Sequence, residues 1–255
     1  MLNIDKYAYS SKLKNINPVG KFVFSVVTLI MCLLSNNILD SIIVIGVMGI
    51  ATVFVGKTPL KVFLKLLTIP LAFLIIGILT ITINYSVNPD KFIISTHIFG
   101  GFIGVSKLGI YKAVVLFFKV LASVCCLYFL SLSTPMVDIL AVLSKLKVPK
   151  IMIEMMSLIY RFIFILLETV NTIFIAQNSR LGYNSIRSSY KSLGALISSL
   201  FIRSFKKAND MYTSLESRGY DGELNVILDE YTNDKTIYII TILLNLLLLT
   251  IKVLM

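Results

Sequence analysis

The chain has 255 residues, of which 57% are hydrophobic and 15% are charged, and its mean hydropathy is +0.89. Soluble domains carry about 45–50% apolar and about 25% charged residues, so this composition excludes an ordinary soluble domain and indicates a membrane protein. The net charge of +11 would suit nucleic acid as a partner, but the basic residues lie mainly between long apolar stretches, which argues against that function.

Five apolar stretches approach the roughly 20 helical residues needed to cross a hydrocarbon core. They lie at residues 21–35, 41–55, 66–83, 113–132 and 237–254. The first two are short and are separated only by the sequence NNILD, so we expect them to form a helical hairpin. The first is not a cleaved signal, because about twenty mostly polar residues precede it and no small-residue cleavage site follows.

The basic residues are distributed unevenly around these stretches. If the N-terminus is cytoplasmic, 19 of the 24 Lys and Arg residues fall on the cytoplasmic side. This distribution follows the positive-inside rule and predicts a cytoplasmic N-terminus and an outer C-terminus. Lys119 lies within the fourth stretch, where an ionisable side chain can mark a transport path, reach the interface or pair with a neighbour.

The residue types used in catalysis and metal binding do not form a known pattern. Cys32, Cys125 and Cys126 lie in apolar stretches without C-x-x-C spacing, so we expect small buried hydrophobic residues. His97, the sole histidine, is expected in an outer loop, because a metal site needs several ligands. The sequence GKT at residues 56–58 resembles the end of a phosphate-binding loop but lacks its earlier glycine. We therefore expect no catalytic residue, metal or cofactor on this chain.

Residues 133–235 are less apolar and are predicted to form three amphipathic helices. Thr134 and Pro135 suit the cap and the first position of the first helix, and the Val-Pro pair at 148–149 ends it. Its apolar face comprises Ile139, Leu140, Val142, Leu143 and Leu146. The third helix is expected at residues 189–218, with apolar side chains along one face.

The second amphipathic helix is expected at residues 150–180, with a narrow polar stripe on an apolar cylinder. The stripe comprises Glu154, Ser157, Arg161, Glu168, Asn171 and Asn178. Such a stripe makes a plain lipid-facing span costly, so we expect the helix to lie against the membrane domain or to dip into it. Glu154, Arg161 and Glu168 are one heptad apart, and Arg161 is interpreted as a structural charge between two acids.

The second and third helices end in similar sequences. Ser179-Arg180-Leu181-Gly182 closes one, and Ser217-Arg218-Gly219 closes the other. A glycine just beyond a helix supplies the left-handed residue that ends it, and a cation in the last turn complements the helix dipole. Two arginine tips also suggest a two-point attachment, because a guanidinium can enter a groove and bind carboxylates in a bidentate manner.

With these endings, the sequence resembles the transmembrane T component of energy-coupling factor (ECF) transporters, and within that family the CbiQ type of cobalt uptake. The resemblance covers nearly the whole chain and is strongest at residues 150–222, in the sequences "LIYRFIFILLETV", "AQNSRLGY" and "MYTSLESRGYDG". The opening "IDKYAYSSKLKNINPVGK" and the break "KLKVPK" also fit.

The resemblance implies a non-catalytic scaffold in a prokaryotic cytoplasmic membrane. Its partners would be two ATP-binding cassette ATPases, which bind ATP and magnesium, and a small integral membrane protein that captures the substrate. In that family each of two helices ends in a short arginine motif that docks in a groove of one ATPase. In this chain the residues that match the motif are Ser179-Arg180-Leu181 and Ser217-Arg218-Gly219. Both have Ser in place of the usual Ala, and the first has an added Leu before Gly182.

The expected fold is therefore an all-α polytopic membrane protein with about five spans. Residues 1–132 would form the N-terminal transmembrane domain, 133–235 a cytoplasmic coupling module, and 236–255 a final transmembrane helix. The cargo remains open among cobalt, nickel, biotin and vitamins, because the capture site would lie on another chain. An independent channel or carrier and a membrane-embedded enzyme are the alternatives from other classes.

Overall fold

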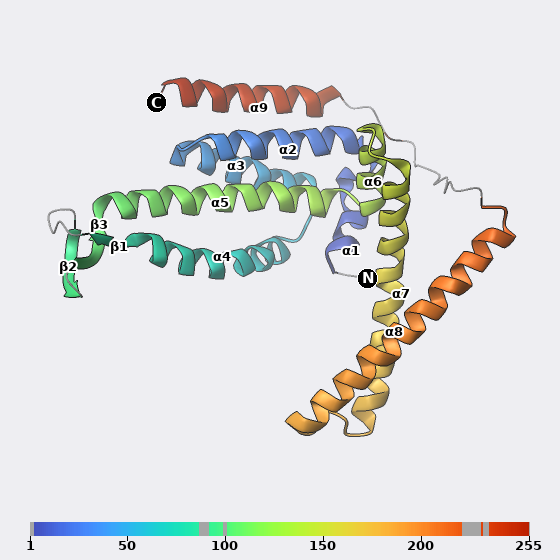
Figure 1. Cartoon of the computed structure of the whole chain (residues 1–255). Helices are drawn as coiled ribbons and strands as arrows, with labels where there is room; N and C mark the ends of the chain where they lie inside the picture. Colours follow the sequence, from blue (N-terminus) through green and yellow to red (C-terminus); the bar gives the residue numbers. More distant parts are fainter. Residues whose placement is uncertain (1–2, 87–91, 99–100, 221–230, 232–234, 255) are drawn as a thin grey trace. The chain divides into compact units, whose positions relative to one another are not determined.

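The computed structural model describes residues 3–86, 92–98, 101–220, 231 and 235–254 (Figure 1). The chain divides into two compact units, one made of residues 2–139 and 229–255 and the other of residues 140–228. The predicted module at 133–235 includes residues 221–230 and 232–234, which lie outside the described residues, as does residue 255 of the predicted final helix.

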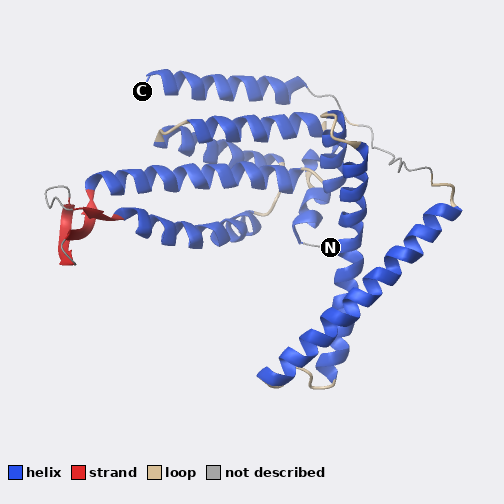
Figure 2. Cartoon of the chain, viewed as in Figure 1, coloured by secondary structure: helices blue, strands red, loops and turns tan. Residues whose placement is uncertain are grey.

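The first unit is built mainly of helices, drawn in blue in Figure 2. Its helices are α1 (Asn3–Ser10), the 3-10 helix η1 (Lys12–Asn15), α2 (Pro18–Leu34), α3 (Ile38–Ile50), the π-helix η2 (Ala51–Val55), α4 (Leu60–Thr82), α5 (Lys107–Ser133) and α9 (Lys235–Leu254). The helix α6 (Met136–Lys145) follows α5 and contains the boundary between the units. Side chains define several starts: the Asn17 side chain accepts from the Val19 amide before α2, and Ser106 accepts from the Gly109 amide before α5.

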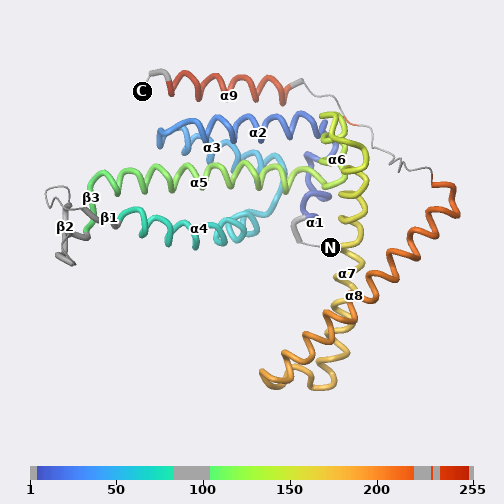
Figure 3. Tube along the Cα trace, in the orientation of Figure 1, coloured from blue at the N-terminus to red at the C-terminus, as the bar shows by residue number. Residues whose placement is uncertain are grey.

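Helix α5 is the centre of this unit, because α1, α2, α3 and α4 all pack against it, while α9 packs on α2 (Figure 3). Phe24 of α2 and Phe129 of α5 meet edge to face, with ring centroids 5.3 Å apart. Cys32, Cys125 and Cys126 are buried and free, as the sequence predicted. The core therefore lies along α5 between the shorter helices.

A three-stranded antiparallel sheet, which was not predicted from the sequence, joins α4 to α5. Its strands are β1 (Ile83–Ser86), β2 (Phe92–Ile98) and β3 (Gly101–Ser106), in the order β1-β3-β2. His97 pairs with Phe102 in this sheet, so the prediction of a loop position was wrong. Long apolar runs reveal spans, whereas strands this short need pairing partners that only the folded chain supplies.

The prediction of an all-α polytopic membrane protein is confirmed. Four helices in the described part of the chain are long and apolar enough to cross a membrane: Ile38–Val55, Leu60–Thr82, Lys107–Ser133 and Lys150–Ser179. The predicted first and last spans fall on shorter apolar helices, Pro18–Leu34 and Thr236–Lys252. The helix at residues 150–179 was predicted to be amphipathic, yet its length and composition also qualify it as a span.

The second unit is dominated by two long helices, α7 (Lys150–Ser179) and α8 (Ile186–Ser217), which pack against each other in an antiparallel hairpin (Figure 1). Helix α8 begins three residues earlier than predicted, because Ser185 caps it: its hydroxyl accepts from the Ser188 amide. The arginine endings are thus the two C-terminal ends of one helical hairpin.

Candidate functional site

The first arginine ending closes α7 with a tight backbone motif. Arg180 is the C-cap residue, the Leu181 amide donates to the Asn178 carbonyl at 2.9 Å, and the Gly182 amide donates to the Gln177 carbonyl at 2.9 Å. These two bonds define a Schellman motif, which satisfies the last carbonyls of a helix. Arg180 therefore sits where the helix stops.

The second ending repeats this motif at the end of α8. Arg218 is the C-cap residue, the Gly219 amide donates to the Glu216 carbonyl at 3.0 Å, and the Tyr220 amide donates to the Leu215 carbonyl at 3.0 Å. Arg218 is therefore equivalent to Arg180 in structure as well as in sequence. The two endings therefore share their backbone hydrogen bonds as well as their residue types. A chance similarity in sequence would not require this.

The two endings differ in which residue adopts the left-handed conformation. Gly219 has φ +75°, as predicted, but at the first ending the left-handed residue is Leu181, with φ +57°. The expectation that Gly182 ends α7 in this way was wrong. A Cβ atom at Gly182 would lie 2.7 Å from the Ser192 hydroxyl and 2.8 Å from the Gln177 carbonyl oxygen, so close packing requires this glycine.

A dense hydrogen-bond network holds the corner between α7 and α8. The Gly182 carbonyl accepts from the hydroxyls of Ser188 at 2.9 Å and Ser192 at 2.8 Å. Gln177 donates to the Ser192 carbonyl at 3.0 Å and accepts from the Tyr183 hydroxyl at 2.7 Å. These bonds fix the direction in which α8 leaves the first arginine tip.

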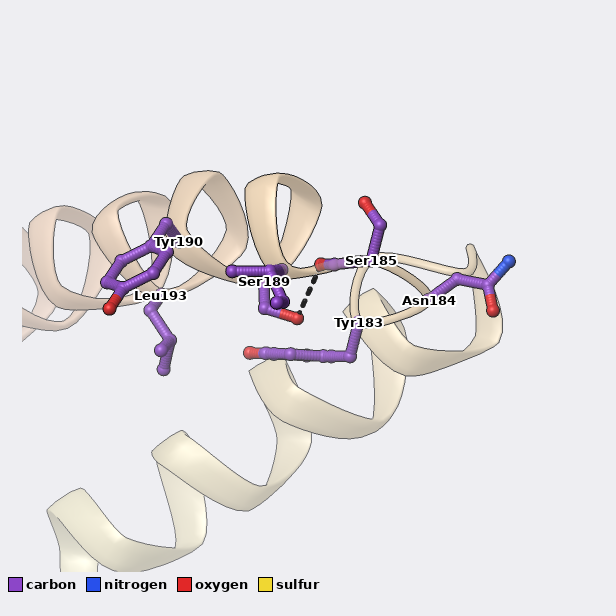
Figure 4. A pocket seen from close by; sticks show the side chains of 7 residues that line it. Tyr183, Asn184, Ser185, Ser189, Tyr190 and Leu193 are labelled. Carbon is purple, nitrogen blue, oxygen red and sulfur yellow. Dashed lines mark hydrogen bonds between the residues drawn. The ribbon is translucent and has the colours of Figure 1, made fainter.

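Tyr183 belongs to a shallow pocket at the start of α8 (Figure 4). The pocket is lined by Tyr183, Asn184, Ser185, Ile186, Ser189, Tyr190 and Leu193. The ring of Tyr183 stacks near Phe174 of α7, with centroids 4.8 Å apart. Ser189 donates its hydroxyl proton to the Ser185 carbonyl at 2.8 Å, so the helix start beside the pocket is well ordered by local bonds.

Both arginine side chains are exposed, and neither pairs with a residue that the structure describes. Helix α8 has 32 residues. At 1.5 Å per residue it is about 48 Å long, so the two tips lie far apart. A single small ligand cannot contact both arginine tips, whereas a large partner with two separate sites can.

Glu154 of the predicted polar stripe contacts the second ending. The Tyr220 hydroxyl donates to the Glu154 carboxylate at 3.1 Å, which links a residue two positions after Arg218 to the first part of α7. Arg161 and Glu168 are exposed, and Arg161 forms no ion pair with any described residue. The stripe is therefore not a continuous ion-pair ladder.

A buried polar cluster in the first unit was not predicted from the sequence. Lys21 is fully buried, and its ammonium donates to the carbonyls of Leu13 at 2.9 Å and Ser133 at 3.1 Å. The Asp138 carboxylate attracts it and accepts from the Tyr231 hydroxyl at 2.6 Å. A lysine at the start of an apolar stretch looks like an interfacial charge, so no sequence signal marked it as buried.

Lys119, considered above as part of a transport path, has a local partner. Its ammonium donates to the side-chain oxygen of Asn36 at 3.1 Å, in the loop between α2 and α3. The GKT sequence follows the π-helix η2 and precedes α4. This setting differs from the strand-to-helix turn of a phosphate-binding loop.

Comparisons with known proteins give a consistent result. The family described as CbiQ, cobalt transport protein, matches residues 9–227. An uncharacterized protein of Methanocaldococcus jannaschii is 35% identical over 224 residues, which cover 88% of this chain and 82% of that protein. The cobalt transport protein CbiQ of Salmonella typhimurium is 25% identical over 89% of this chain and 100% of that protein.

Other relatives carry a name that does not mention cobalt. The energy-coupling factor transporter transmembrane protein EcfT of Lactococcus lactis subsp. cremoris is 26% identical over 226 residues, which cover 83% of this chain and 81% of that protein. The matched part of each relative extends over most of its length. The range matched by the family, residues 9–227, contains both arginine endings.

Proposed function

Because this chain belongs to the CbiQ cobalt transport protein family, we propose that it is the transmembrane coupling subunit of an ATP-driven ECF-type importer. It is a multi-pass membrane protein of a transporter family. In the proposal it is a non-catalytic subunit without a cofactor of its own, and ATP and magnesium bind to partner ATPases. Its N-terminus lies in the cytoplasm, which the excess of basic residues on that side supports.

The observation on which this proposal rests is the pair of matching helix ends. Arg180 and Arg218 each cap a long helix within the same Schellman motif, and both are exposed. We assign the docking role to Ser179, Arg180, Leu181 and Gly182 at one end and to Ser217, Arg218 and Gly219 at the other. Two ABC-type ATPases offer two equivalent grooves, and the length of α8 keeps the tips far enough apart to reach both.

The exposed apolar face of the same two helices is evidence for a second partner. Leu158 and Phe162 of α7, with Phe201 and Phe205 of α8, line an open apolar groove. Phe201 is 72% exposed and Phe205 is 66% exposed, which is costly in water and favours contact with lipid or protein. We propose that a small integral membrane substrate-capture subunit packs here, so that residues 133–235 act as the coupling module between it and the ATPases.

In this proposal, ATP binding and hydrolysis close and reopen the two ATPases. Their grooves move the arginine tips, and the hairpin transmits this movement to the capture subunit. A ligand shifts an equilibrium only through differential contacts in the two states, so the tips must bind differently in the open and closed ATPase pair. Residues 1–132 and 236–255 would provide the surrounding transmembrane helices.

Cobalt ion is the proposed cargo, which the family description and the names of several relatives support. Nickel, biotin or vitamins remain the alternative, because the more general EcfT relatives do not name a substrate. The residues of this chain do not select among them. Identification of the small membrane protein that copurifies with the tagged chain from native membranes distinguishes these cargoes.

The docking role is tested by the double variant Arg180→Ala, Arg218→Ala. We expect this variant to insert into the membrane normally but to retain ATPase subunits at least about tenfold more weakly in affinity purification, because buried charged hydrogen bonds at an interface are worth roughly 2–5 kcal/mol. The matched control is Arg187→Ala, Arg203→Ala, which removes two exposed arginines from elsewhere on α8. Normal ATPase retention by the first variant would refute the docking role.

A further inference from the structure

The junction between α3 and α4 carries an unusual turn. Lys57 has φ +55°, a left-handed conformation that is strained for a lysine, and it follows the π-helix η2. The turn is closed by hydrogen bonds from the Gly56 amide to the Ala51 carbonyl at 2.9 Å and from the Thr58 amide to the Thr52 carbonyl at 3.4 Å. These bonds hold Lys57 in a conformation that an isolated chain would avoid.

A side-chain bond joins this turn to the N-terminal segment. The buried Ser11 hydroxyl donates to the Gly56 carbonyl at 3.2 Å. Lys12 and Lys57 follow the two bonded residues directly, so their exposed side chains gather at one place. Lys61, also exposed, lies in the first turn of α4, where the helix dipole adds partial positive charge.

These like charges lack compensation within the described residues. Contact with the Lys57 side chain and its positive charge lower the pKa of Lys12, and no carboxylate raises it. An anion placed between the two ammonium groups would replace this repulsion by attraction. A phosphate monoanion or diester fits the chemistry of clustered lysines beside a helix N-terminus.

The surroundings of the lysines are apolar. Phe54 is 73% exposed and Val55 52% exposed before the turn, while Leu60 and Leu64 are 52% and 53% exposed after it. The turn separates two helices that are each long enough to cross a membrane, so it lies at the membrane surface. A cluster of cations next to exposed apolar side chains matches a molecule with an anionic head and hydrocarbon tails.

We propose that Lys12, Lys57 and Lys61 form a binding site for the phosphate headgroup of an anionic phospholipid, whose acyl chains lie against the exposed apolar side chains of the same junction. The lipid would stabilise the strained turn and join the N-terminal segment to the start of α4. This inference is independent of the ATPase-docking role, because none of its residues lies in α7 or α8.

The test compares lipid binding by the purified full-length chain in detergent, measured by native mass spectrometry. The double variant Lys12→Gln, Lys57→Gln is matched with Lys107→Gln, Lys252→Gln, which removes two exposed lysines at other helix ends. We expect the unaltered chain to retain phosphatidylglycerol in preference to phosphatidylcholine. Loss of two lysines should weaken phosphatidylglycerol binding about 10- to 30-fold, whereas the control variant should bind as the unaltered chain does.

Several results would overturn the proposal. Equal binding of the two lipids, unchanged binding by the first variant, or equal losses in both variants would each contradict a specific headgroup site. Displacement of the lipid by millimolar inorganic phosphate would identify a free anion as the ligand, and displacement by a copurified transporter subunit would identify a protein. The single variant Lys61→Gln gives the same comparison if the double variant does not fold.

Discussion

Leu181 and Gly219 occupy the same position in the same helix-ending motif, with φ angles of +57° and +75°. A side chain in this conformation brings its Cβ close to the following carbonyl, at a cost of roughly 1–2 kcal/mol, whereas glycine has no such cost. The Leu181 side chain is 70% exposed, so packing within the chain offsets little of this strain. The strain at the first ending is consistent with a side chain placed for a partner.

Replacing Leu181 by glycine, and Gly219 by leucine, tests this strain directly. Leu181→Gly should stabilise the first ending by about 0.5–1 kcal/mol, because the relief of strain exceeds the added entropy of glycine in the unfolded chain. Amide hydrogen exchange of Gly182 should then slow by about two- to fivefold. The reverse change, Gly219→Leu, should accelerate exchange at Tyr220. Faster exchange in both variants would show that strain does not distinguish the two endings.

At the scale of elements, the contact between α2 and α9 depends on a small residue. A Cβ atom at Gly20 would lie 3.2 Å from the Ile237 side chain and 3.5 Å from the ring of Tyr238. This close approach lets the last helix pack directly on the second, although more than 200 residues separate them in the sequence. A larger side chain must displace α9 or distort α2.

We therefore expect Gly20→Leu to destabilise the first unit by about 1–3 kcal/mol, the usual cost of overpacking. The buried free thiols of Cys32, Cys125 and Cys126 report this directly, because a thiol-reactive fluorophore labels them only when the unit opens. Labelling on heating should begin at a lower temperature than in the unaltered chain. Gly46→Leu is the control, since nothing lies within 4 Å of a Cβ at that position. Similar shifts for both variants would argue against a specific α2–α9 contact.

At the scale of the whole molecule, one buried lysine joins segments from across the first unit. Lys21 bonds to Leu13 before α2 and to Ser133 at the end of α5, and it attracts Asp138, which accepts from Tyr231 before α9. The cluster thus links the N-terminal segment, the central helix and the chain that leads into the last helix. A buried ammonium is tolerated because carbonyls and a carboxylate compensate it.

Lys21→Met should lower the stability of this unit by roughly 2–5 kcal/mol, because it removes the ammonium that donates to two carbonyls and balances the buried charge of Asp138. The same thiol-labelling experiment measures the change. Lys6→Met, at an exposed position of α1, should leave the labelling temperature nearly unchanged. An equally small effect of Lys21→Met would mean that water replaces the ammonium at little cost.

The membrane class, most of the spans and the two arginine endings could be predicted from the sequence alone. These properties are local: a long apolar run must avoid water, and a helix needs a stop and a compensating charge at its end. Family resemblance added the coupling role on the same residues. The equivalence of Arg180 and Arg218 could also be read from the sequence, because both follow a serine at the end of a polar turn.

Contacts between residues far apart in the chain could not be predicted from the sequence pattern. The folded chain placed the left-handed conformation on Leu181 instead of Gly182. It requires glycine at position 182 for another reason, because Ser192 of the next helix approaches too closely for a side chain. It buried Lys21 against a carbonyl 112 residues away and brought Lys12 beside Lys57 through the Ser11 bond to Gly56. Composition and periodicity report the tendency of each segment to be helical or buried, but such long-range contacts depend on how the segments pack.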